Sequence, residues 1–190
     1  MPLGECKGWP MDRDTPPHDE PPLERDNPWW GRYWADPWAG RFETVVMGLA
    51  DEPQGLVLAA VRGVLSVALA SREVASPEEA ALDDAHAVPI HGAGGEISEL
   101  IADLAEEVLD RLAIHGSGLD HLRLDGMLET DTGGYSAWGY VVGRADGPAI
   151  PVVQLVGVPV VEMRSPDDAG EGPLLSVRIR VTREGAHGSR

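Results

Sequence analysis

The chain has 190 residues, of which 32 are acidic and 15 are basic, so its formal net charge is −17. This charge repels phosphate backbones, and no cluster of Lys and Arg overrides it, which argues against direct binding of nucleic acid. The single cysteine, Cys6, cannot form an internal disulfide, and no apolar run approaches the ~20 residues that a membrane-spanning helix needs. We therefore expect a cytoplasmic protein with no membrane segment.

The N-terminal part of the chain has the composition of a tail. Its prolines lie among charged residues, and proline withholds a hydrogen-bond donor and blocks a helix. We therefore expect residues 1–41 to form a tail that is disordered or docks onto another surface. A domain is expected at residues 42–183, followed by a flexible C-terminus at residues 184–190.

Within this tail, four tryptophans fall in a stretch of ten residues, namely Trp29, Trp30, Trp34 and Trp38. Tryptophan is costly to leave in water and is frequent at interfaces. The stretch is expected to dock onto its own domain as an N-terminal arm or onto a protein partner. Stacking on RNA bases is a third alternative, which the acidic surroundings disfavour.

The first half of the expected domain contains a strand, a helix and a second strand. A short apolar strand is predicted at residues 42–49, and a helix is predicted between Gly55 and Ser71, where apolar residues at helical spacing cover most of the circumference. The next strand is predicted at residues 87–90, after which the glycines of residues 91–95 are expected to turn the chain.

The second half begins with the clearest helix, at residues 97–112, which is apolar on one face, acidic outside it and ended by His115-Gly116. Four strands separated by turns rich in Gly and Asp complete the chain, at residues 119–129, 135–142, 150–163 and 174–182. This order predicts an α+β fold of two layers, in which a mixed β-sheet carries both helices on one face.

The motifs of common enzymes are absent from the sequence. Gly92-Ala93-Gly94-Gly95 lacks the pattern of a phosphate-binding loop, and Gly116-Ser117-Gly118 follows a helix, whereas a nucleophile elbow follows a strand. The histidines do not have the i, i+4 spacing of helical metal ligands. We therefore expect no catalytic site and a protein that is not an enzyme. A hydrolase that uses Asp51 with His91 or His115 is the last alternative, because no spacing supports it.

Several segments between residues 42 and 181 resemble archease, the small protein that assists the RNA-splicing ligase of the RtcB type. Ala60-Val61-Arg62-Gly63-Val64 stands where that family has an Ala-Val-Arg-Gly-Leu-like segment in its first helix. The helix at residues 97–112 looks like the acidic and apolar second helix of the family. Ala149-Ile150-Pro151-Val152-Val153 resembles a strand that begins Val-Pro-Lys-Ala-Val, and residues 174–181 resemble the last strand.

The resemblance also identifies candidate metal ligands. Family archeases hold a divalent cation, Ca2+, with acidic residues, and two of these acids fall at Glu43 and Asp51, while the acid near the end of the last strand falls at Arg180. The resemblance thus implies weak Ca2+ binding at best, because Ca2+ needs more oxygen ligands. As a hypothesis, Arg180 places a fixed cation where the metal would lie and pairs with Glu43 or Asp51. The alternative is that Arg180 is only a solvated residue of a strand.

The resemblance implies a non-enzymatic activator that binds an RtcB-type RNA ligase and promotes its guanylylation. Such a ligase is basic because it holds RNA, and complementary charge speeds the encounter with an acidic protein. The alternative function is a diverged adaptor that keeps the fold, has lost ligase activation and binds another protein through the tryptophans of residues 29–38.

Overall fold

The computed structural model describes residues 29, 31–40, 43–69, 86–144, 147–164 and 174–183. Their elements follow in the order β1 (Arg32–Gly40), β2 (Glu43–Ala50), α1 (Pro53–Ala68), β3 (His86–Gly94), α2 (Ile97–His115), the 3-10 turn η2 (Gly116–Gly118), β4 (Leu119–Glu129), β5 (Tyr135–Gly143), β6 (Val153–Leu155), β7 (Val160–Arg164) and β8 (Leu174–Arg183). Neither α1 nor α2 combines the length and the apolar character that would let it cross a membrane.

In the described part of the chain the strands form two sheets, and each hydrogen-bonded pair is antiparallel. Sheet A has the strand order β1-β2-β8-β6, and β7 pairs with the same edge of β8 as β6. Sheet B has the order β3-β5-β4. The α+β class predicted from the sequence is confirmed, while the strands divide between two sheets instead of forming one.

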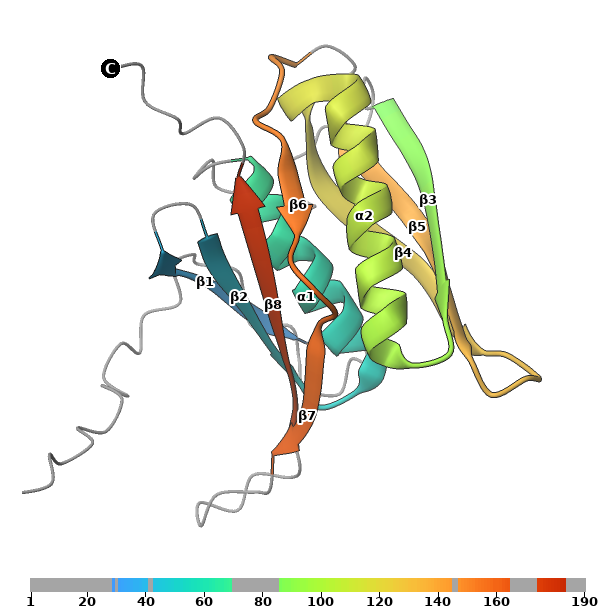
Figure 1. Ribbon diagram of the computed structural model, residues 1–190. Helices are drawn as coiled ribbons and strands as arrows, with labels where there is room; N and C mark the ends of the chain where they lie inside the picture. Colours follow the sequence, from blue (N-terminus) through green and yellow to red (C-terminus); the bar gives the residue numbers. More distant parts are fainter. Residues whose placement is uncertain are drawn as a thin grey trace, which may run out of the picture.

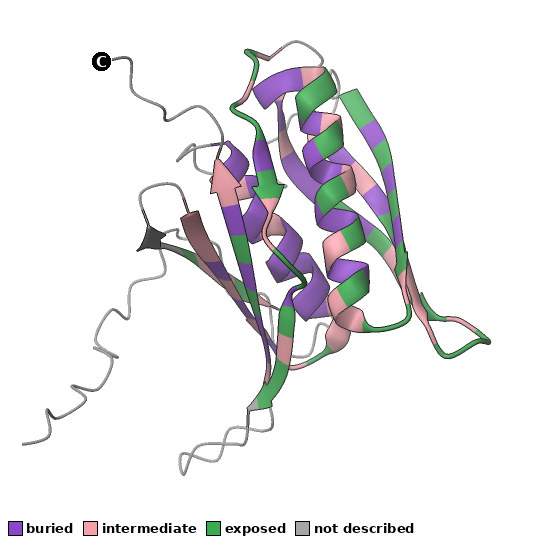
Figure 2. Ribbon diagram, in the orientation of Figure 1, coloured by how far each residue is buried: buried purple, intermediate pink, exposed green. Residues whose placement is uncertain are grey.

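The two helices lie between the two sheets (Figure 1). Helix α1 packs on β1, β2 and β8 of sheet A and also reaches β4, whereas α2 packs on β3 and β5 of sheet B and reaches β6 and β7. Figure 2 shows the consequence, because α1 is buried around most of its circumference. The apolar pattern that predicted a covered helix therefore reflects contact with a sheet on one side and with α2 and β4 on the other.

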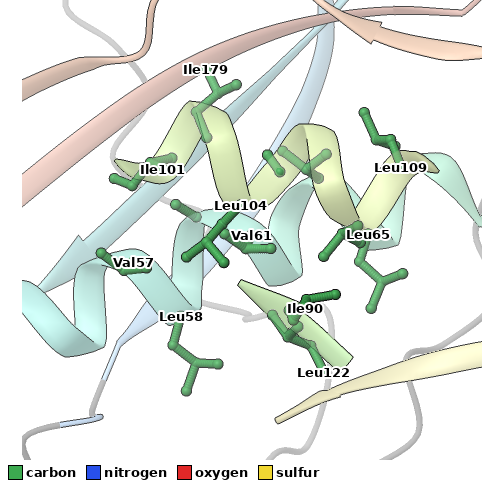
Figure 3. Packing of buried hydrophobic residues seen from close by; sticks show 14 of the residues in the cluster. Val57, Leu58, Val61, Leu65, Ile90, Ile101, Leu104, Leu109, Leu122 and Ile179 are labelled. Atoms are coloured by element: carbon green, nitrogen blue, oxygen red, sulfur yellow. The ribbon is translucent and has the colours of Figure 1, made fainter. Parts of the chain in front are cut away.

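The hydrophobic core joins all three layers. Val61 of α1 and Leu104 of α2 lie together at the centre, with Ile179 of β8 on the side of sheet A and Ile90 and Leu122 on the side of sheet B (Figure 3). Each of these side chains is at most 3% exposed. Full burial of such a side chain contributes about 1.5–3 kcal/mol, so this cluster holds the helices between the sheets.

Strand β1 lies in the segment that was expected to be a tail. It pairs with β2, with Arg32 opposite Leu49 and Trp34 opposite Met47, and its Tyr33 side chain packs beside Gly63 of α1. The described domain therefore begins before residue 42, and for residues 32–40 the arrangement is that of an N-terminal arm on its own domain. Residues 1–28 and 184–190 lie outside the described residues, so the predictions for them stay predictions.

The glycines after residue 90 do not turn the chain as expected, because β3 continues to Gly94. A Cβ on Gly92 would lie 2.6 Å from Leu104 Cγ, and a Cβ on Gly94 would lie 2.5 Å from the backbone nitrogen of Leu100. These glycines are therefore explained by the close approach of α2 to the strand. The chain turns at Gly95, immediately before α2.

The strand predicted at residues 150–163 is divided into β6 and β7. Between them Gly157 has a φ of 74°, in the left-handed region that glycine adopts most easily. The Val156 amide still donates a hydrogen bond of 2.8 Å to the Arg180 carbonyl, so the chain stays on the edge of β8 across the break.

Candidate functional site

Glu43 and Arg180 meet on the solvent face of sheet A. Glu43 begins β2 and lies opposite Thr182 of β8, and Arg180 lies opposite Val45, so the two residues are diagonal neighbours on adjacent strands. Arg180 Nε donates a hydrogen bond to Glu43 Oε1. The structure thus brings together two residues that are 137 positions apart in the sequence.

The electrostatics of this pair are those of a permanent cation beside a carboxylate. The Arg180 side chain is 54% exposed, whereas that of Glu43 is 19% exposed. The hydrogen bond from Arg180 to Glu43 and the charge of Glu43 raise the pKa of the guanidinium above its ordinary value. Arg180 is therefore a positive charge beside Glu43 at neutral pH, as the guanidinium of arginine is in proteins generally.

Asp51 lies away from this pair, in the turn between β2 and α1. Because β2 runs from Glu43 to Ala50, Asp51 follows the opposite end of the strand. At about 3.3 Å for each residue of a strand, Asp51 is about 25 Å from Glu43. The expectation that Glu43 and Asp51 contribute to one metal site is therefore corrected, since no single ion can contact both carboxylates.

The residues around Glu43 do not fit a Ca2+ site. Calcium takes six to eight oxygen ligands, mostly from carboxylates and carbonyl groups. The carboxylate of Glu43 instead faces the guanidinium of Arg180. Across the described ranges, no group of three or more His, Cys, Asp and Glu side chains is arranged to hold a metal ion. We therefore assign no step of the function to calcium.

The two tryptophans near the N-terminus whose side chains the structure describes, Trp29 and Trp34, do not share one surface. Trp29 is partly buried and packs against the hydrophobic core. Trp34 lies on the solvent face of sheet A, because its neighbour Tyr33 points towards α1 and side chains alternate along a strand. Trp30 and the side chain of Trp38 lie outside the described residues, so their expected role in partner binding stays a prediction.

The groups considered for a hydrolase occupy separate places. The His91 ring and the Ser136 hydroxyl are 3.0 Å apart on the exposed face of sheet B. His115 ends α2, and its ring lies 5.4 Å from that of His86. Asp51 precedes α1, at the end of the helix layer where α2 begins (Figure 1). Helix α2 has 19 residues and is therefore about 28 Å long, which separates Asp51 from His115.

Two open hollows lie at that same end of the molecule, on either side of Tyr135. One is formed by residues 93–95 and the turn at residues 130–134, and the other by the start of α1 and the end of β4. The first is lined by backbone and by Thr130 and Thr132, and the amides near the start of α2 already donate to Glu99. Neither hollow brings together the carboxylate and the histidine that the hydrolase alternative requires.

Sequence reasoning assigned no role in binding to two exposed side chains of the sheet faces. Arg178 lies on the solvent face of β8, two residues before Arg180, and Trp138 is 39% exposed on the outer face of sheet B. The alternation of Arg178 and Arg180 with buried residues indicated a solvated face of the last strand. The neighbours of that face follow only from the register of β2 and β7 against β8.

Comparison of the chain with protein-family models, with curated proteins and with solved structures gave no match.

Proposed function

We propose that this chain is an archease-like, non-enzymatic activator that binds an RtcB-type RNA ligase and promotes its guanylylation. The contact between Glu43 and Arg180 carries the proposal. The resemblance aligns these two positions with acids of the first and last strands that hold one cation in archeases. Residues that share a cation have to be neighbours in the fold, and these two positions are neighbours here.

The guanidinium of Arg180 gives this site a cation that does not depend on metal. A bound Ca2+ leaves when its concentration falls, whereas an arginine keeps its charge at any pH at which a protein is folded. The position that a divalent ion would take beside Glu43 is filled by the Arg180 side chain. The proposed activator is therefore active with or without Ca2+.

The net charge of −17 supports a basic partner. A ligase that holds RNA needs positive surface, and complementary charge raises the rate of encounter between two proteins. Because that attraction is screened by salt, the stimulation of the ligase should weaken as ionic strength rises from about 0.05 M to about 0.5 M.

The test is a guanylylation assay with a purified RtcB-type ligase and labelled GTP. We expect the full chain to raise the initial rate at which GMP becomes attached to the ligase, with no further increase when Ca2+ is added. In Arg180→Glu, two carboxylates face each other and this stimulation should be lost. Arg123→Glu is the matched control, because Arg123 forms a similar exposed ion pair with Asp125 on sheet B.

Two results would count against the proposal. If the folded chain in excess leaves the rate of guanylylation unchanged, the chain does not activate that ligase. If calorimetry detects Ca2+ binding with micromolar affinity, and Arg180→Gln leaves that affinity unchanged, Arg180 does not take the place of a metal. Folding of each variant is checked by circular dichroism.

A diverged adaptor is the second candidate, and the position of Trp34 favours it. This tryptophan lies on the solvent face of an edge strand, where a partner can reach it. Because β1 belongs to sheet A, a deletion through residue 41 would damage the fold, so Trp34→Ala is the better test. Trp138→Ala on sheet B is its control. An adaptor requires that Trp34→Ala weakens binding of a partner while the chain leaves ligase guanylylation unchanged.

A further inference from the structure

Four side chains form a row across the solvent face of sheet A. Trp34 of β1 lies opposite Met47 of β2, Met47 lies opposite Arg178 of β8, and Arg178 lies opposite Val160 of β7. Residues directly opposite each other in antiparallel strands project from the same face. We call these four residues the cross-strand row.

The cross-strand row has the composition of an interface. Trp34 and Met47 are half-buried although they lie outside the hydrophobic core, and Val160 is 42% exposed. Tryptophan, methionine and arginine are enriched in the centres of protein interfaces relative to the rest of the surface. Contiguous apolar side chains on a sheet face that points away from the core make this face a candidate binding surface.

Arg178 indicates that the segment or molecule bound to the cross-strand row is acidic. Among the described residues, Arg123, Arg111 and Arg180 each form an ion pair, whereas Arg178 forms none. Its guanidinium is exposed and stands between Met47 and Val160. Its direct cross-strand neighbours are apolar, and no ion pair joins it to Glu162, which lies two residues beyond Val160 on the same face of β7. Such an arginine fits a segment in which acidic and apolar residues are mixed.

The chain itself contains such a segment. Residues 1–28 include seven acidic and three basic residues, together with Trp9, Met11 and Leu23. The segment continues directly into Trp29 and β1, which is the edge strand of sheet A and contributes Trp34 to the cross-strand row. Arg178 is two strands away from β1, or about 10 Å, which 28 residues reach easily.

We propose that residues 1–28 bind in cis to the cross-strand row, with a carboxylate of the segment paired to Arg178. The small size of the row favours this occupant over a separate molecule. Four strands and about five residues along each give a footprint of roughly 300 Å², whereas stable complexes bury about 800 Å² on each partner. A tethered segment has an effective concentration of the order of mM, which compensates for a small contact.

The single cysteine makes the proposal testable in the full chain. A spin label attached to Cys6 broadens the amide signals of residues that it approaches in an NMR spectrum. We expect selective broadening of amides in β8 and β7 around Arg178 and Val160. Amides around Trp138 in β5 are the internal reference, because they belong to sheet B. The Arg178→Glu variant should lose the selective broadening, whereas Arg123→Glu should keep it.

The same label distinguishes the other possible occupants. Absence of broadening, or equal broadening in β5 and β8, overturns the proposal. Broadening of an isotope-labelled Cys6→Ser chain by a second, spin-labelled chain would show that the row binds another copy and would also overturn binding in cis. If Arg178→Glu disturbs the fold, Arg178→Gln replaces it, and its amide spectrum must match that of the wild type outside the row. The experiment uses this chain alone, so its outcome is independent of ligase activation.

Discussion

Replacement of Gly63 by alanine tests the packing of α1 against sheet A, because two physical terms predict opposite signs. In an exposed helix, Gly→Ala stabilises by about 1 kcal/mol. In this structure, a Cβ on Gly63 would overlap Cγ1 of Val46, which is fully buried, and would lie 3.3 Å from Cδ2 of Tyr33. Overpacking of a core costs about 1–3 kcal/mol, so we expect Gly63→Ala to lower the free energy of unfolding by about 1 kcal/mol.

The assay is urea unfolding followed by far-ultraviolet circular dichroism, with Val46→Ala and the double variant measured beside Gly63→Ala. Val46→Ala removes the atom that the new methyl group would meet, so the double variant should be more stable than the sum of the two changes predicts, by about 1–2 kcal/mol. Stabilisation by Gly63→Ala, or strict additivity of the two changes, would refute the close packing of α1 on β1 and β2.

Three further substitutions, with Ile114→Ala as an exposed control, test other features of the fold by the same assay. Leu104→Ala in the core should cost about 2–5 kcal/mol, whereas Ile114→Ala, at a side chain that is 70% exposed, should change stability by less than about 0.5 kcal/mol. Gly92→Val should destabilise by about 1–3 kcal/mol although valine suits a strand, because the new side chain meets Leu104. Gly157→Ala should cost about 1–2 kcal/mol through its positive φ alone, since no atom lies within 4 Å of the added carbon.

Local periodicity was sufficient to predict both helices. Helix α2 begins at Ile97 as expected and ends at His115. The next residue, Gly116, adopts a φ of 76°. The ends of β4, β5 and β8 lie within one residue of their predicted positions. These elements have a strong pattern of alternating or helical burial, which the sequence carries in consecutive residues.

The features that the sequence did not predict depend on contacts between distant residues. Strand β1 contains Pro37 and closely spaced tryptophans, a pattern more typical of a tail, and it is a strand because it pairs with β2. Gly92 and Gly94 are typical turn residues that here leave space for α2. The division of the strands into two sheets likewise follows from pairing, which no local pattern specifies.

The candidate site was predictable only through the resemblance. Two carboxylates were considered as partners of Arg180, and the choice of Glu43 over Asp51 depends on the register of β2 against β8. The position of Asp51 illustrates the limit of that reasoning. The resemblance aligns Asp51 with an acid of the archease metal site. In this structure, however, Asp51 follows the last residue of β2, whereas Glu43 is the first residue of that strand.

The two proposals meet on one surface, which leads to a prediction that neither makes alone. Arg178 and Arg180 project from the same face of β8 and are two residues apart, or about 7 Å. A segment paired to Arg178 would therefore obstruct a ligase that approaches Arg180. The ligase would bind only those molecules in which residues 1–28 have left the cross-strand row, which we call open. The apparent Kd is the intrinsic Kd divided by the fraction of open molecules, so tenfold tighter binding is expected on removal of residues 1–28 if the row is open for about a tenth of the time.

A chain that begins at residue 29 retains β1 and the whole of sheet A, so titration of both chains into the ligase isolates the effect of the segment. The segment also adds negative charge, and its removal should lower the rate of encounter with a basic partner. Removal of the segment thus strengthens ligase binding by ending the competition and weakens it by removing negative charge. High salt distinguishes the two effects because it screens only the effect of charge. If the truncated chain binds no more tightly than the full chain at high salt, while the label at Cys6 still reports docking at Arg178, the ligase and the segment occupy different surfaces.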